Sequence, residues 1–217
     1  LLLLLTGCGS EWNWNQKLIV TVETPNGPAR GAAVVRVNIT TTPDAITPPE
    51  ARGMHSAYTG EAAMVALGEG RYLFALLGAE VQRTIETFGD APPGFGVKAG
   101  KAAVGEWNDT IVAMRERRPL PRRAWPRFVT FADIADPASV QLVDPDDLAA
   151  TFGPGHRIAA VELELTGEAP TDGAVEKVLG WIGSTKGRLK PTNKKFAHEL
   201  TFEETLYADR FVQRAIK

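Results

Sequence analysis

The sequence has a single cysteine, Cys8, in 217 residues, so no disulfide can form within the chain. Histidine is also scarce, since His55, His156 and His198 are the only three and lie far apart. A zinc site needs several such ligands to converge. We therefore expect no metal and no cofactor, and a fold that depends on its hydrophobic core.

The chain also lacks the common catalytic motifs. It has no Gly-x-Ser-x-Gly turn, no His-Glu-x-x-His, no Cys-x-x-Cys and no phosphate-binding Gly-x-x-x-x-Gly-Lys-Ser/Thr loop. The glycine-rich segment 94–100 fails the dinucleotide pattern because its third glycine comes one residue late. These absences favour a protein that is not an enzyme.

An excess of charge of one sign is missing as well. The net charge is −2, whereas nucleic-acid-binding domains are normally basic, so we expect no nucleic-acid partner. After residue 8 no apolar run approaches the roughly 20 residues that span a bilayer. The 21 glycines and 15 prolines favour short elements joined by many turns.

The first eight residues differ from this ordinary composition. Five leucines at positions 1–5 lead into Thr6, Gly7 and Cys8. The sequence Leu5, Thr6, Gly7, Cys8 resembles the lipobox of bacterial lipoproteins, in which small residues after an apolar segment precede a cysteine that becomes lipidated. The resemblance implies that residues 1–7 end a signal peptide and that Cys8 carries a diacylglycerol and a further acyl chain such as palmitate. The alternative is a short buried N-terminal strand.

The same resemblance implies a location in the cell envelope. Gly9 and Ser10 follow Cys8, and neither is the aspartate that retains many Gram-negative lipoproteins at the inner membrane. We therefore expect an outer-membrane lipoprotein that faces the periplasm, with an envelope protein as a further partner. The chain does not begin with Met, so we expect a charged start to precede residue 1. Trp12 and Trp14, in the predicted leader 8–16, either sit at the lipid headgroups or cover the edge of a sheet.

From residue 17 onward the pattern indicates strands. β-Branched residues alternate with polar ones, and turn residues at 25–28, 60 and 68–70 divide the segments. Short strands at this spacing predict a β-sandwich over residues 17–114. We predict strands at 18–24, 31–40, 56–59, 62–67 and 71–77. Residues 81–88 favour a further strand, and residues 107–114 a strand or a short helix.

Residues 17–80 also carry a family resemblance. Their turn glycines and inward-facing apolar residues are similar to those of the transthyretin-like fold of carboxypeptidase regulatory-like domains. The resemblance implies a structural or binding module without naming its ligand. The matching residues are Gly27, Gly31, Ala32, Val35, Val37, Thr59, Gly60, Ala62, Leu67, Gly70 and Tyr72.

Residues 115–127 hold a run of arginines with three prolines among them. Arginine binds phosphate bidentately, so the run is a candidate site for phosphate, anionic lipid or lipopolysaccharide. A solvated connector between two halves of the chain is the interpretation that we favour. The candidate residues are Arg115, Arg117, Arg118, Arg122, Arg123 and Arg127.

Five aspartates follow a predicted strand at 127–131. Their spacing does not fit a calcium loop, whereas Asp-Pro pairs suit helix starts, so we favour capping over metal binding. The next segments predict a short helix that ends at Phe152, a half-exposed strand at 157–166 and a helix from residue 171. Residues 196–217 are ambiguous, with helical spacing in part. The aspartates are Asp133, Asp136, Asp144, Asp146 and Asp147.

Together these observations predict a mainly β protein with some α (α+β). An N-terminal β-sandwich is followed by a connector at 115–127 and a smaller α+β region at 128–217. Residues 128–165 resemble uncharacterised proteobacterial lipoproteins, which implies no activity. The function expected is a lipid-anchored envelope protein that binds or scaffolds without catalysis. The alternative is a lipoprotein hydrolase that pairs His156 with an aspartate of residues 133–147.

Overall fold

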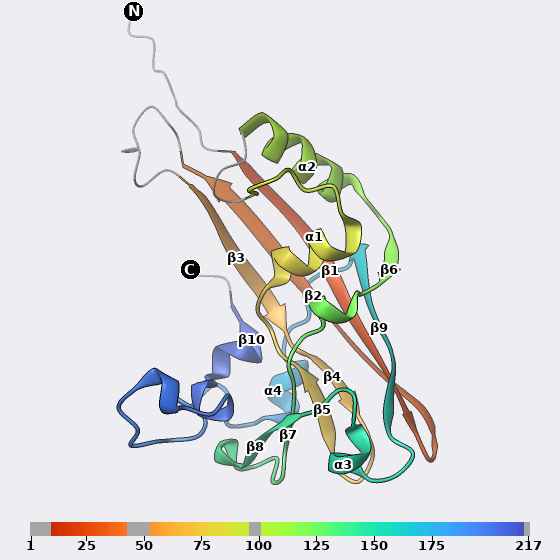
Figure 1. The fold of residues 1–217 in the computed structure, drawn as a ribbon, viewed down its shortest axis with the longest axis vertical. Coiled ribbons are helices and arrows are strands. Elements are labelled where there is room, and N and C mark those ends of the chain that lie inside the picture. The colour runs from red at the N-terminus through yellow and green to blue at the C-terminus, as the bar shows by residue number, and fades with distance from the viewer. Residues whose placement is uncertain (1–9, 43–52, 96–100, 215–217) are drawn as a thin grey trace, which may run out of the picture.

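The described part of the chain forms two antiparallel sheets and four α-helices (Figure 1). The computed structural model describes residues 10–42, 53–95 and 101–214. The larger sheet has the order β10-β3-β2-β1-β9-β6, and the smaller has the order β4-β5-β7-β8. The chain is mainly β with some α, as the sequence predicts. The strands are β1 (Glu11–Thr24), β2 (Gly27–Thr41), β3 (Met54–Glu61), β4 (Ala63–Ala66), β5 (Tyr72–Ala75), β6 (Arg117–Pro119), β7 (Phe128–Phe131), β8 (Val140–Val143), β9 (Arg157–Thr166) and β10 (Val212–Gln213).

A long hairpin of β1 and β2 forms the centre of the larger sheet. Its two strands pair from Glu11 with Thr40 to Thr24 with Gly27. The turn is tight, and Gly27 has a φ of 103°, which a residue without a Cβ adopts at little cost. Strand β9 pairs with the other side of β1 over residues 157–166, the bounds that its alternating pattern predicts.

The smaller sheet packs against the larger one at a close backbone contact. A Cβ on Gly31 of β2 would lie 2.0 Å from the carbonyl oxygen of Met64 in β4, so only glycine allows this approach. Trp14, Leu18, Val20 and Val22 of β1 share one hydrophobic core with Leu73 of β5. The two layers are therefore held by direct contact between strands.

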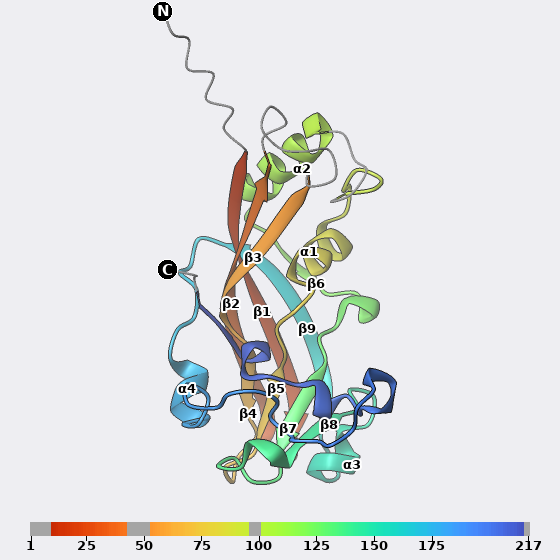
Figure 2. The same cartoon turned by 90° about the vertical axis from the view of Figure 1, so that its left-hand side faces the viewer.

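Helices cover the rest of the same face. Helices α1 (Glu80–Phe88) and α2 (Lys101–Ala113) lie beside the part of the larger sheet that the smaller sheet leaves open (Figures 1 and 2). The other helices are short: α3 (Leu148–Phe152) precedes β9, and α4 (Ala174–Val178) follows it. No helix in the described ranges is long and apolar enough to cross a membrane.

Both sheets draw strands from before and after the connector. Strand β9 pairs with β1, β10 pairs with β3, and β7 pairs with β5. The regions predicted as 17–114 and 128–217 therefore share their sheets and their core. Strand pairing between distant segments leaves no local signal in the sequence. The proline-rich connector is therefore the place where the sequence pattern predicts a boundary between two regions.

Several local predictions need correction. Residues 81–88 are helical, because Val81, Ile85 and Phe88 pack on the core at helical spacing. For residues 107–114 the sequence left a strand and a short helix open. The structure has the helix, which starts earlier, at residue 101. Residues 196–214, whose pattern was ambiguous with helical spacing in part, form three short 3₁₀ turns and β10.

The two leader tryptophans cover the sheet. Trp14 is buried, donates a hydrogen bond of 3.1 Å to the side chain of Gln16 and meets Trp107 of α2 edge to face. Trp12 is half-buried against α2 and donates to Asp109 at 2.8 Å. Because Trp14 is enclosed in the core, the interfacial pair is not formed.

Candidate functional site

The predicted connector is part of the larger sheet at its start. Residues 117–119 form β6, the edge strand beside β9, and Leu120 donates its backbone N–H to Val161. A 3₁₀ turn at Arg122–Ala124 then leads into β7 of the smaller sheet. The segment therefore bridges the two layers, and its arginines point to several different neighbours.

Four of the six arginines have acidic partners. Arg117 pairs with Glu164 of β9 at 2.7 Å, and Arg122 pairs with Asp146 at 2.6 Å. Arg118 pairs with Glu116 at 2.6 Å and lies over the ring of Phe88. In each of these ion pairs the carboxylate balances the positive charge of the guanidinium group.

The fourth pair links the connector to α1. Arg123 donates to the carboxylate of Glu86, and this hydrogen bond lowers the pKa of Glu86 below its usual value. Arg115 has a different role, because its guanidinium donates to the carbonyl oxygens of Val112 and Met114 at the end of α2. A cation at that end also interacts favourably with the helix dipole. Five of the six arginines thus have structural partners.

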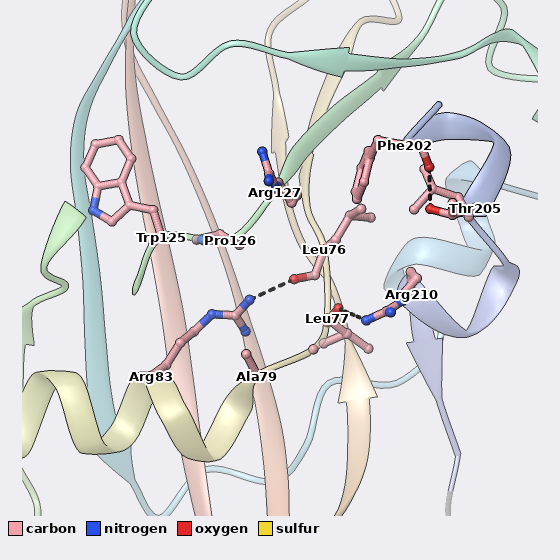
Figure 3. Close-up of a pocket in the computed structure, with 12 residues that line it drawn as sticks. Leu76, Leu77, Ala79, Arg83, Trp125, Pro126, Arg127, Phe202, Thr205 and Arg210 are labelled. Carbon is pink, nitrogen blue, oxygen red and sulfur yellow. Dashed lines mark hydrogen bonds between the residues drawn. The ribbon is translucent and has the colours of Figure 1, made fainter. Parts of the chain in front are cut away.

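Arg127 is the exception. Its guanidinium carbon lies 5.5 Å from the ring centre of Phe202, and it has no ion pair within the described part of the chain. It lines a cavity of about 240 Å³ between the start of α1, the connector and residues 202–210 (Figure 3). Two further arginines line the same cavity, Arg83 from α1 and Arg210 from the C-terminal segment.

Arg83 is almost fully buried, with a relative exposure of 5%. One of its terminal nitrogens donates to the Glu80 carboxylate, and the other donates to the carbonyl oxygen of Leu76 at 3.2 Å. Its Nε is buried without a hydrogen-bond partner. Figure 3 shows the guanidinium directed toward Leu76 at the cavity wall.

Arg210 approaches the cavity from the other side. Its Nη1 lies 3.4 Å from the carbonyl oxygen of Leu77, to which it donates, and sits against Gly78. A Cβ on Gly78 would come within 2.6 Å of that nitrogen, so a glycine makes room for the guanidinium. The cavity lining contains these three arginines and no acidic side chain; its apolar walls include Leu76, Trp125 and Phe202.

The aspartates act as caps and turn formers. Asp136 accepts from the backbone N–H of Ala138 at 2.9 Å, and Asp147 accepts from that of Ala150 at 3.1 Å at the start of α3. Asp133 and Asp144 accept backbone N–H groups two residues later in the same way. The capping interpretation is confirmed at Asp136, which caps the 3₁₀ turn that starts at Pro137, whereas the cap of α3 is Asp147 and not Asp144 of the second Asp-Pro pair. No cluster of three metal-ligating side chains lies in the described ranges.

The histidines do not form the pair with an aspartate that the alternative hypothesis, a hydrolase, would use. His156 is buried, and its Nδ1 lies 3.0 Å from the carbonyl oxygen of Gly153, not from an aspartate of residues 133–147. His198 stacks on Phe196 at the surface. Within the part of the chain that the structure describes, no histidine has a hydrogen bond to a carboxylate. The lipidation residue, Cys8, lies outside the described residues.

No protein-family model, curated protein or solved structure matches this chain at a significant level. The class of protein that the fold and the cavity define is a two-layer α+β protein with an arginine-lined pocket. The sequence indicated Arg127 as one of six candidates, whereas Arg83 and Arg210 were missed. Neither has a local signal, since contacts between distant segments, among them the hydrogen bonds of Leu77 with Arg210, bring the start of α1 and the C-terminal segment together.

Proposed function

We propose that this protein is a lipid-anchored binding module of the bacterial cell envelope, tethered through Cys8. The observation that carries the proposal is the lipobox-like sequence Leu5, Thr6, Gly7, Cys8 at the end of a leucine run. Two or three acyl chains on one cysteine give the stable anchoring that a single chain does not. The arginine-lined cavity supports a binding role for the body.

The spacing between anchor and body supports a short tether. Only Gly9 and Ser10 separate Cys8 from Glu11, the first residue of β1. Three residues span at most about 11 Å, because an extended chain advances about 3.6 Å per residue. A lipid on Cys8 therefore holds the start of β1 and the neighbouring end of α2 close to the bilayer surface.

The anchor is tested with Cys8→Ser in the full-length precursor. We expect this change to abolish labelling by a radioactive fatty acid, to block processing to the mature size and to remove the protein from the labelled membrane lipoproteins. Ser10→Ala, two residues away, keeps the thiol and serves as the matched control. Lipid labelling that persists in the Cys8→Ser protein contradicts the anchor.

The outer-membrane location has a separate test. On a sucrose gradient, we expect the wild-type protein with outer-membrane markers, and Ser10→Asp with inner-membrane markers. The expectation follows from the resemblance to Gram-negative lipoproteins, in which an aspartate at the second position after the cysteine retains the protein. A wild-type protein that sediments with the inner membrane counts against the outer-membrane assignment and leaves the anchor intact.

A further inference from the structure

We propose that the cavity lined by Arg83, Arg127 and Arg210 binds a small phosphate monoester with an apolar group. The proposal rests on the proposed binding role and gives that role a ligand class. Its test does not depend on the anchor, so each can fail without the other.

The charge of the cavity selects a dianion. The positive charge of Arg83 is balanced by its ion pair with Glu80. Arg127 and Arg210 have no carboxylate partner in the described ranges, and no acidic side chain lines the cavity. A phosphate monoester carries a charge of about −1.5 to −2 at pH 7 and therefore balances these two arginines.

The donors of the cavity suit phosphate oxygens. Guanidinium groups donate parallel N–H bonds that match phosphate geometry, and Arg127 makes no hydrogen bond that holds it elsewhere. Arg83 carries a buried Nε with no partner, which is unusual for a polar atom in a folded protein. Because Glu80 already balances the charge of Arg83, the net positive charge of the cavity comes from Arg127 and Arg210.

The walls and the volume limit the rest of the ligand. Leu76, Trp125, Pro126 and Phe202 form apolar walls beside the arginines. The volume of about 240 Å³ lies below the roughly 300–1,000 Å³ of pockets for drug-sized molecules, so the ligand is small. One ring or a short aliphatic chain beside the phosphate fits this description.

The position of the cavity favours a ligand that is free in solution over a lipid headgroup. Gln16 of β1 hydrogen-bonds Glu80 at the start of α1, beside the cavity. It stands five residues into β1, which is roughly 17 Å from the end of β1 next to the anchor at about 3.3 Å per residue. With β1 directed away from the bilayer, a headgroup of the anchoring membrane does not reach that far.

The test is calorimetric titration of the full chain in a non-ionic detergent, with phenyl phosphate as the probe. We expect saturable binding of one phenyl phosphate, weaker binding of benzoate and inorganic phosphate, and none of neutral benzyl alcohol. Arg127→Gln and Arg210→Gln should each weaken binding by at least about tenfold, the loss expected for one charge-assisted contact. Arg127→Lys, which keeps the charge and loses the fork, should weaken it less.

Arg115→Gln is the matched control, because it removes the same charge at a site outside the cavity, and it should bind phenyl phosphate as the wild type does. Thermal melting of each variant shows whether it is folded. Absence of binding in the folded wild type overturns the proposal, as does unchanged affinity in a folded Arg127→Gln, Arg210→Gln double variant. Phosphatidic acid in mixed micelles that displaces phenyl phosphate at lower concentration overturns the assignment to a free ligand.

Discussion

The carboxylate of Glu61, the last residue of β3, accepts a 2.7 Å hydrogen bond from the backbone N–H of Gly173, 112 residues further along the chain. It also accepts from the N–H groups of Ala174 and Val175, at 2.9 and 3.1 Å. Gly173 is the residue before α4 and has no side chain with which to cap the helix. A buried acid on the sheet therefore supplies the cap that the helix lacks, and attaches the second half of the chain to the first.

We predict that the cap formed by Glu61 contributes measurably to the free energy of unfolding. Glu61→Ala leaves three N–H groups at a buried helix end without acceptors, so we expect the free energy of unfolding to fall by about 2–3 kcal/mol. Urea denaturation measures this change. The exposed Glu106→Gln on α2 is the control and should stay within about 0.5 kcal/mol of the wild type. A loss below that limit for Glu61→Ala contradicts the capping role.

The ion pair of Glu80 and Arg83 predicts strong coupling between the two residues. Their side chains are 3% and 7% exposed, so Arg83→Met leaves a buried carboxylate without its cation. We expect the free energy of unfolding to fall by about 3–5 kcal/mol. The double variant with Glu80→Met removes both charges and should be less destabilised than the sum of the single variants. Additive losses in the urea denaturation cycle count against the pairing.

The sequence predicted best those elements whose pattern is local. The alternation at 157–166 gave β9 with its observed bounds, and the pair Asp136-Pro137 was rightly assigned to a helix start. Helix α1 was missed because Thr84, Ile85 and Thr87 favour a strand locally. Its helical form is fixed by distant contacts, such as the 2.5 Å hydrogen bond from Thr84 to Gln16.

The candidate site shows the same limit. Arg127 was predicted as one member of a run, but its neighbours along the chain pair with acids on β9, on α1 and near α3. Its partners across the cavity, Arg83 and Arg210, are 127 residues apart in sequence. Only the packing of the β5–α1 connection against residues 202–210 brings them together, and no spacing rule encodes that contact.

Glu204 predicts a loss of stability in acid. It accepts from Lys194 at 2.7 Å and from the backbone N–H of Thr201, and the hydrogen bond from Lys194 is the main reason that its pKa falls from 4.5 to about 2. A lowered folded pKa stabilises the protein above the unfolded value, and this stabilisation is lost as the pH falls from about 4.5 to about 2.

The measurement is the urea midpoint of the wild type and of Glu204→Gln between pH 7 and pH 2. A neutral glutamine resembles the protonated acid, so we expect the wild type to be more stable at pH 7 and the two curves to converge below pH 4.5. Glu199→Gln, in the adjacent exposed turn, is the control. A difference that stays constant down to pH 2 shows that the charge of Glu204 is not responsible.

The last prediction concerns the arginines of the connector that lie outside the cavity. If they form a site for an anionic surface, neutralising them must weaken binding to vesicles of anionic lipid. That binding must also fall steeply as the salt concentration rises, because exposed charges are screened beyond about 8 Å at physiological ionic strength. The variant combines Arg117→Gln, Arg118→Gln, Arg122→Gln and Arg123→Gln.

We expect no such effect, because each of the four cations already faces a carboxylate at Glu164, Glu116, Asp146 or Glu86. An added anion must compete with that carboxylate, and the pair offers little net positive charge. The body from Gly9 onward, which lacks both the leucine run and the anchor, should not bind vesicles of anionic lipid at low salt, with or without the four changes. Each exposed pair is worth about 0–1 kcal/mol, so the variant should remain folded with a lower urea midpoint. Vesicle binding by this body that disappears in the four-arginine variant would show that the pairs open to bind a membrane. Phenyl phosphate binding should survive these changes because Arg127 and Arg210 are kept.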